Sequence, residues 1–179
     1  NWQGDDVEKT KKHVDHISVL LEDIAKHKRH GTIKNHAFVS RIETLVKNAT
    51  GYLTEMKLRE YSTIVLFEFL REYTKAVKEG DDVPAINEYT FERWVPLLAP
   101  LCPHTAEEIW HIGGKKTFVS SSPWPSFDAK KIDEKAEFLD ESLERLCDDI
   151  REIQKLAKVE KLRNVRLIVA PAWKYGFVK

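Results

Sequence analysis

Apolar residues recur at intervals of three and four along most of the chain, which is the spacing of one face of an α-helix. The pattern predicts a first helix over about 5–28, a second from an N-cap at Thr32 to about 56, and a third over about 58–78. Their predicted apolar stripes are Val7, Val14, Ile17, Leu21 and Ile24; Phe38, Ile42, Leu45, Ala49, Leu53 and Met56; and Leu58, Tyr61, Val65, Phe69, Tyr73 and Val77. The first two-thirds of the chain is therefore expected to be a bundle of amphipathic helices.

Prolines divide the next segment, FERWVPLLAPLCPHTAEEIW, into two helices. A connection at residues 82–84 leads into the first of them. Pro100 should end this helix, because its ring removes a hydrogen-bond donor and disfavours helix in the residue before it. Pro103 suits the first turn of a new helix, where a missing N–H group matters little. The segment therefore predicts two helices joined by a tight corner, with Trp110 as an apolar anchor of the second.

After Trp110 the composition changes, because glycine, serine and proline residues follow each other too closely to sustain a helix. We expect an ordered loop here, held in place by its aromatic residues Phe118, Trp124 and Phe127. A sixth helix follows, and its apolar residues alternate in steps of four and three: Leu139, Leu143, Leu146, Ile150, Ile153 and Ala157. Such a seam is expected to pack on another helix.

The last segment, from Val165 to Phe177, is rich in β-branched and aromatic residues and predicts a strand. Because one strand is not stable alone, the segment is interpreted as the beginning of a truncated α/β element. The expected fold is therefore mainly α: a helical bundle over residues 1–127, and over 128–179 a helix plus the first strand of a truncated C-terminal α/β domain.

Charge is balanced over the whole chain, with 29 Lys and Arg against 29 Asp and Glu, but it is unevenly distributed. Between residues 24 and 41 there are five basic residues and no acidic ones: Lys26, Lys28, Arg29, Lys34 and Arg41. Residues 128–152 show the reverse, ten acidic residues against five basic ones. Any contact with a nucleic acid is therefore expected at the first segment and not at the second.

The sequence also limits the compartment. It has no apolar run long enough to cross a bilayer, and its charged start, NWQGDDVEK, does not fit a secretory signal. Cys102 and Cys147 are the only cysteines, and neither belongs to a CxxC motif. We therefore expect a protein of the reducing cytoplasm that has no contact with a membrane.

The proline corner resembles the LLAPxxPHxxEExW signature of the helical anticodon-binding domain of class I aminoacyl-tRNA synthetases, in the group for leucine, isoleucine, valine and methionine. The matching residues are Leu97, Leu98, Ala99, Pro100, Pro103, His104, Glu107, Glu108 and Trp110. A "W P" element after the corner, Trp124 with its flanking prolines, is also similar to these enzymes. The stretch VAPAWKY and the initial Asn-Trp pair resemble leucyl-tRNA synthetases of the archaeal and eukaryotic type.

This resemblance implies an RNA-binding function. The bundle would hold tRNA, tRNA(Leu) above all, for a catalytic domain outside this chain, and would work beside the catalytic and editing domains of the parent enzyme. Enzymes for leucine do not depend on the anticodon, so the bundle is expected to bind the body of the tRNA by shape and charge. Our candidates for phosphate contacts are Lys28, Arg29, Lys34 and Arg41, followed by Lys57 and Arg59.

No cofactor is expected within this chain, whereas the parent enzyme would use ATP and Mg²⁺. The stretch HIGG, residues 111–114, differs by one letter from the ATP-binding HIGH motif, but it trails a predicted helix where the motif should open one. Its glycines are therefore interpreted as a helix stop. His13 with His16, and Cys102 with His104, lack the further ligands of a closed zinc site. We find no arrangement that predicts catalysis in this segment.

Two alternatives remain open at this point. The same domain could come from a valyl-, isoleucyl- or methionyl-tRNA synthetase. A function of another class is a helical scaffold that docks protein partners through the seam from Leu139 to Ala157.

Overall fold

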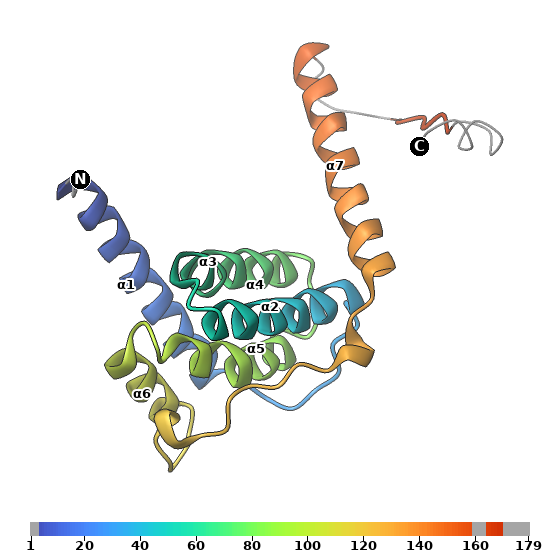
Figure 1. The fold of residues 1–179 in the computed structure, drawn as a ribbon. Helices are drawn as coiled ribbons and strands as arrows, with labels where there is room; N and C mark the ends of the chain where they lie inside the picture. Colours follow the sequence, from blue (N-terminus) through green and yellow to red (C-terminus); the bar gives the residue numbers. More distant parts are fainter. Residues whose placement is uncertain (1–3, 159–163, 170–179) are drawn as a thin grey trace. The chain divides into compact units, whose positions relative to one another are not determined.

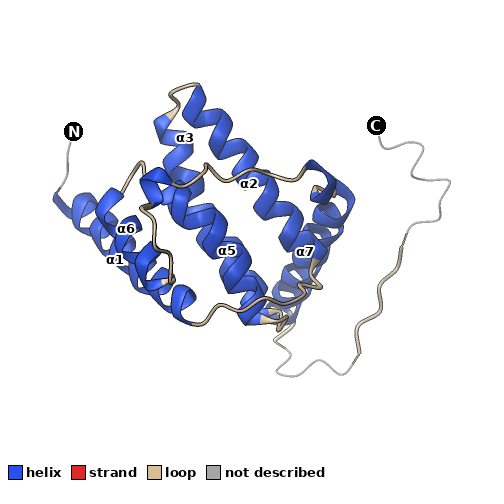
Figure 2. Ribbon diagram, turned by 90° about the horizontal axis from the view of Figure 1, so that it is seen from below, coloured by secondary structure: helices blue, strands red, loops and turns tan. Residues whose placement is uncertain are grey.

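The computed structural model describes residues 4–158 and 164–169, and all regular structure in these ranges is helical (Figures 1 and 2). The elements are α1 (Gly4–Lys26), α2 (His36–Thr54), α3 (Leu58–Thr63), η1 (Ile64–Glu68), α4 (Phe69–Lys78), α5 (Val83–Leu98), α6 (Pro103–Ile112), η2 (Val119–Ser121), η3 (Ala129–Lys131) and α7 (Glu134–Leu156). The predicted mainly α fold with a helical bundle is confirmed. The chain divides into two compact units, Asn1–Phe138 and Leu139–Lys179.

The core of the first unit is formed by the apolar stripes of its helices. α1 packs against α5 and α6, and α2 packs against α3, α4 and α5. Ile17, Leu21 and Ile24 of α1 are buried, as the helical spacing predicts. The stripe is shorter than predicted at its beginning, because Val7 is 46% exposed. Helical periodicity therefore identifies the buried faces correctly and overextends them at their ends.

The start of α2 differs from the prediction. The N-cap is Asn35, whose side-chain oxygen accepts a hydrogen bond from the backbone N–H of Phe38 at 2.9 Å, and Thr32 lies outside the helix. The backbone N–H groups of Lys34 and Asn35 donate instead to the Asp81 carboxylate, each at 2.8 Å. These bonds to a residue distant in sequence hold the preceding segment in a non-helical conformation, so the cap moves forward by three residues.

The third predicted helix is interrupted by η1, one π-helical segment between α3 and α4. Two of its backbone carbonyls accept hydrogen bonds from other helices. The indole Nε1 of Trp94 donates to the Val65 carbonyl at 2.7 Å, and Nε2 of His13 bonds the Leu66 carbonyl at 2.7 Å. In a regular α-helix these two carbonyls would accept hydrogen bonds within the helix. In the π-helical segment they also accept hydrogen bonds from side chains of α1 and α5.

The proline corner has the predicted form. α5 ends at Leu98, just before Pro100, and α6 begins at Pro103. Trp110 is 5% exposed and stacks on Phe91 with 5.4 Å between the ring centroids. Gly113 is the C-cap of α6, and its N–H donates to the Ile109 carbonyl at 2.9 Å. The interpretation of the HIGG glycines as a helix stop is therefore confirmed.

The position of Gly113 leads to a stability prediction. A Cβ atom built on Gly113 would lie 2.2 Å from Cζ of the buried Phe91 ring. Gly113→Ala should therefore lower the free energy of unfolding by about 1–3 kcal/mol, the range for overpacking. Gly51→Ala is the matched control, because no atom lies within 4 Å of its added Cβ, and it should raise stability by a few tenths to about 1 kcal/mol. Urea unfolding measures both changes, and equal midpoints for the two variants would contradict the steric argument.

Residues 115–133, which we call the strap, connect α6 to α7 and contain η2 and η3. Val119 is buried, but Phe118, Trp124 and Phe127 are 62%, 39% and 40% exposed. Phe118 is thus mostly exposed, whereas more than half of the surface of Trp124 and of Phe127 is covered, so the expected anchoring by aromatic residues holds in part for these two. Polar contacts with the bundle, described below, also hold the strap.

The second unit contains most of α7, whose apolar seam is largely exposed: Leu139 and Leu143 at 62% and Ile153 at 64%. The strand predicted from Val165 is absent over residues 164–169, where the side chains are exposed. A strand needs a partner for its backbone groups, and the described residues offer none at this position. The rest of the predicted strand, 170–177, lies outside the described residues.

Candidate nucleic-acid interface

The connection between α1 and α2 carries the first group of predicted contacts, and it is held to the corner between α4 and α5. The backbone N–H of Arg29 donates to the Pro84 carbonyl at 3.0 Å, and Asp81 accepts the two N–H groups described above. At Gly31 an added Cβ would meet the side chains of Ala85 and Asp82 at 2.8 Å, so the two segments approach closely. The backbone that carries these cationic residues is therefore held in place by hydrogen bonds to the corner between α4 and α5.

Within it, Arg29 and Lys34 face solvent. The Arg29 side chain is 68% exposed, and its Nη2 lies 3.3 Å from the Asp82 carboxylate. Lys34 is exposed and lowers the pKa of Asp81 by charge. Lys28 is half-buried, with its ammonium 5.1 Å from the centre of the Phe91 ring. The positive charge of the connection between α1 and α2 is thus partly offset by Asp81 and Asp82, which lie between α4 and α5.

Arg41 lies apart from this group. Its side chain is only 17% exposed and pairs with the buried carboxylate of Glu72 at 3.5 Å. Its Nη2 also donates to the backbone carbonyl of Glu137 at 3.2 Å. The structure therefore places Arg41 as an internal ion pair that joins α2, α4 and the first turn of α7, and does not bring it to the surface with Arg29 and Lys34.

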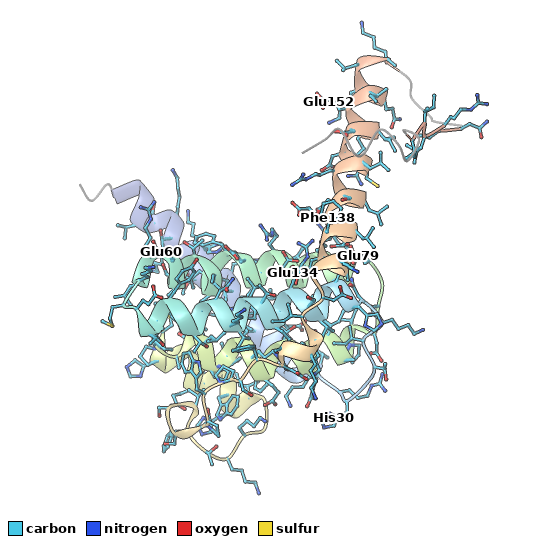
Figure 3. All side chains as sticks on the ribbon, turned by 45° about the vertical axis from the view of Figure 1, so that its right-hand side comes forward. His30, Glu60, Glu79, Glu134, Phe138 and Glu152 are labelled. Atoms are coloured by element: carbon cyan, nitrogen blue, oxygen red, sulfur yellow. The ribbon has the colours of Figure 1, made fainter. Side chains whose placement is uncertain are left out.

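Lys57 and Arg59 lie at the other end of α2. A helix of this length is roughly 28 Å long, so they form a second site well separated from the first. In Figure 3, Glu60 marks this end, whereas Glu79 and His30 mark the other. Lys57 pairs with Glu55 at 2.6 Å, and Arg59 lines an open pocket of about 250 Å³ between α2 and α3. The six predicted residues thus form two cationic groups and one internal ion pair.

Hydrogen bonds attach the strap to α2, and the two segments run antiparallel. The indole Nε1 of Trp124 donates to Oγ1 of Thr50 at 2.9 Å, and the N–H of Asp128 donates to Glu43 at 2.7 Å. Further along, the N–H of Asp133 donates to Oγ of Ser40 at 2.7 Å. Residues later in the strap therefore contact residues earlier in α2.

Glu43 is the centre of this arrangement, because its fully buried carboxylate accepts hydrogen bonds from one charged and two neutral donors. One carboxylate oxygen accepts from Arg93 at 2.7 Å and from the hydroxyl of Tyr89, while the other accepts the Asp128 N–H. The Arg93 guanidinium also lies over the Tyr89 ring, 3.6 Å from its centre. Burial, together with the bond to Glu43, raises the pKa of Tyr89, so its hydroxyl stays protonated and donates.

Glu107, one of the acidic residues of the signature, also holds the strap. Its carboxylate accepts the backbone N–H groups of Val119 at 2.7 Å and Ser120 at 3.1 Å. Desolvation raises the pKa of Glu107, but these backbone bonds outweigh it, and the pKa is lowered below its ordinary value of 4.5. The signature carboxylate therefore has a structural role in joining α6 to the strap.

A pH dependence follows from Glu107 and Asp81. Desolvation raises the pKa of Asp81 as well, but the N–H groups of Asn35, Asp82 and Lys34 outweigh it and lower the pKa below 3.8. A carboxyl group with a lowered folded pKa stabilises the fold above its unfolded pKa, and this contribution is lost as the pH falls through the folded value. Stability should therefore fall below about pH 4.5. Urea unfolding of Glu107→Gln between pH 3 and 7 should show a weaker decline, and an unchanged profile would contradict this role.

Basic residues of the strap and of α2 were not among the predicted contacts. The strap contains four basic residues, Lys115, Lys116, Lys130 and Lys131, and two acidic ones, Asp128 and Asp133. Lys47 of α2 is exposed and lies between Glu43 and Thr50 on the helix stripe that faces the strap. The three aromatic residues Phe118, Trp124 and Phe127, with a pair of lysines on either side of them in the sequence, were the signal that could have identified this surface.

Comparison with known proteins identifies the family. The family described as anticodon-binding domain of tRNA ligase matches residues 35–169, more than half of the chain. The chain belongs to this family.

Similar proteins include several archaeal leucine–tRNA ligases. The protein from Ignicoccus hospitalis is 39% identical over 133 residues, which cover 70% of this chain and 13% of the relative. Those from Methanocaldococcus jannaschii and Archaeoglobus fulgidus are 30% and 28% identical over 97% and 100% of this chain, and each match covers 19% of the relative. The chain thus spans less than a fifth of the length of these curated relatives.

Metal ligands, membrane-spanning helices and cysteines were also considered in the sequence. Within residues 4–158 and 164–169 no group of three potential ligands is arranged for a metal ion. In the same ranges no helix is both long and apolar enough to cross a membrane. Cys102 and Cys147 are free thiols.

Proposed function

We propose that this chain is the tRNA-binding helical region of a leucine–tRNA ligase, where it positions tRNA(Leu) for aminoacylation by a catalytic part outside these 179 residues. The observation that carries the proposal is the similarity of nearly the whole chain to archaeal leucine–tRNA ligases, within a family of anticodon-binding domains. The similarity extends beyond the signature to both ends of the chain, which favours leucine over isoleucine, valine or methionine. In such an enzyme ATP and Mg²⁺ serve the catalytic part, and the free cysteines suit a cytoplasmic location.

The exposed cations suggest how the RNA is held. Arg29 and Lys34 at one end of α2, with Lys57 and Arg59 at the other, are far enough apart to contact phosphates on different parts of a folded RNA. Lys28 supports the first group from its half-buried position. Arg41, paired internally, contributes to the rigidity of α2 more than to phosphate binding. Recognition of this kind depends on shape and backbone charge, which suits contact with the body of the tRNA.

Removal of the first cationic group tests this arrangement. Arg29→Ala with Lys34→Ala should weaken binding of a tRNA(Leu) transcript and reduce the slope of log K against log salt by about one unit or less per lost contact. The matched control is Arg145→Ala with Lys155→Ala, which removes two exposed cations from the acidic helix α7. Fluorescence anisotropy at several salt concentrations gives both slopes. Equal slopes for the two double variants would contradict a role of the first group.

A second function is favoured by one observation, the exposure of the α7 seam at Leu139, Leu143 and Ile153. Such a stripe suits docking of an amphipathic helix. Light scattering and a gel shift with tRNA separate the two proposals. A monomer that shifts tRNA supports the RNA-binding function, whereas self-association without a shift supports the scaffold.

A further inference from the structure

A second set of exposed basic and aromatic side chains is formed by Lys47, Trp124, Phe127 and Lys131, which we call the strap surface. Trp124 and Phe127 are 39% and 40% exposed, an unusual exposure for large aromatic residues in an ordered segment. Both lie beside residues fixed to α2: Trp124 through its own bond to Thr50, and Phe127 through the bond of the adjacent Asp128 to Glu43. These bonds tie both residues to the bundle, while part of each ring remains open to solvent.

The bond to Thr50 matters because it satisfies the polar edge of the Trp124 ring. Indole has one donor, Nε1–H, and the protein already occupies it at 2.9 Å. What Trp124 still offers to a ligand is apolar ring surface, which suits stacking and not hydrogen bonding. Phe127 offers the same kind of surface three residues further along the strap.

Exposed lysines lie close in sequence to the points where the strap is attached to α2. Lys47 is exposed on α2, one turn after Glu43 and three residues before Thr50, so it lies on the stripe between the two attachment points. Lys131 of η3, which packs on α2, is exposed with its ammonium 5.2 Å from the centre of the Tyr89 ring. Two acidic residues lie at the same attachment points: Glu43 is buried against Arg93, and the exposed Asp128 accepts the Lys130 N–H at 3.0 Å.

Exposed aromatic rings beside lysines on a rigid support match the chemistry of unpaired nucleotides. A base stacks on a ring without a specific hydrogen bond, and the adjoining phosphates pair with ammonium groups. A fully paired stem keeps its bases covered and can use only the cations. We propose that the strap surface binds an unpaired nucleotide of the bound RNA, with the base on Trp124 or Phe127 and the phosphates at Lys47 and Lys131. This inference rests on the proposed function, because it places one more contact of the same tRNA.

The test uses the 179-residue chain, a tRNA(Leu) transcript and tryptophan fluorescence. Stacking should quench Trp124, so tRNA should quench the wild-type chain more than Trp124→Phe, while a fully paired RNA duplex should quench both equally. At least one of Trp124→Leu and Phe127→Leu, whichever ring carries the base, should weaken tRNA binding at least about fivefold, the lower bound for loss of one base–aromatic stack. Their salt slopes should stay unchanged, whereas Lys47→Ala should lower the slope by about 0.7–0.9.

Phe118→Leu is the matched control, because Phe118 is 62% exposed on the same strap but lies against His111 of α6. It should bind tRNA as the wild type does. If Phe127→Leu and Phe118→Leu bind alike and the tRNA-induced quench survives in Trp124→Phe, the inference is wrong while the proposed function stands. If the wild type binds no tRNA, the proposed function fails and this inference fails with it. Should Trp124→Leu not fold, the wild-type quench and Phe127→Leu still decide the outcome.

Discussion

Glu43→Ala should destabilise the bundle by about 3–5 kcal/mol, the range for breaking a buried ion pair at one partner. The substitution leaves the Arg93 guanidinium, the Tyr89 hydroxyl and the Asp128 N–H without their shared acceptor. Arg93 is only 17% exposed in its side chain, so water replaces the lost partner poorly. The strap also loses its attachment at Asp128, which should make this segment the first to open.

Urea unfolding measures the change in free energy, and limited proteolysis measures the opening of the strap. Glu43→Gln is the conservative comparison, because its amide keeps the size and one acceptor of the carboxylate but removes the charge. It should lose less stability than Glu43→Ala. The surface variant Glu141→Ala, which removes an exposed partner of Arg145, should change stability by no more than about 1 kcal/mol. A similarly small loss for Glu43→Ala would show that the buried cluster does not hold the bundle.

Trp94→Ala should have an effect of similar size, about 3–5 kcal/mol. The side chain is fully buried, stacks on Phe69 at 5.5 Å between ring centroids, and donates to the Val65 carbonyl in the π-helical segment. Truncation therefore leaves a large cavity and an unpaired buried carbonyl at once.

Trp94→Phe separates the two contributions, because it keeps an aromatic ring but cannot donate to Val65. Its cost should be roughly 1–3 kcal/mol for the unpaired carbonyl, with a smaller term for the lost volume. Thermal or urea unfolding followed by circular dichroism measures both variants. Equal losses for Trp94→Ala and Trp94→Phe would show that the hydrogen bond, and not the packing, dominates at this position.

Much of the bundle could be predicted from the sequence, because the buried stripes and the proline corner are local patterns. Ile17, Leu21 and Ile24 are buried as their spacing requires, and Gly113 ends α6 as a helix stop. The cap of α2 could not be predicted in the same way. Thr32 and Asn35 are both residue types that cap helices, with Asn the better of the two, and the choice here depends also on bonds to Asp81, far away in sequence.

The candidate interface was predictable only in part, because charge in a sequence does not reveal which partner each side chain finds. Arg29 and Lys34 do reach solvent, but Arg41, in the same cationic run, turns to the buried Glu72. The attachment of the strap was hidden for a similar reason, since it depends on polar residues of α2 that periodicity alone treats as interruptions of an apolar stripe. The predicted strand at 165–169 failed because a β-rich composition does not supply a partner strand.

We propose that this bundle binds tRNA through the charges on its surface. The most direct measurement is the affinity of the wild-type chain for a tRNA(Leu) transcript and for an unstructured RNA of equal length, taken by anisotropy across a salt series. The account predicts tighter binding of the folded tRNA, with log K falling linearly against log salt as bound counterions are released. No binding at low salt, or equal affinity for the two RNAs at every salt concentration, would contradict it.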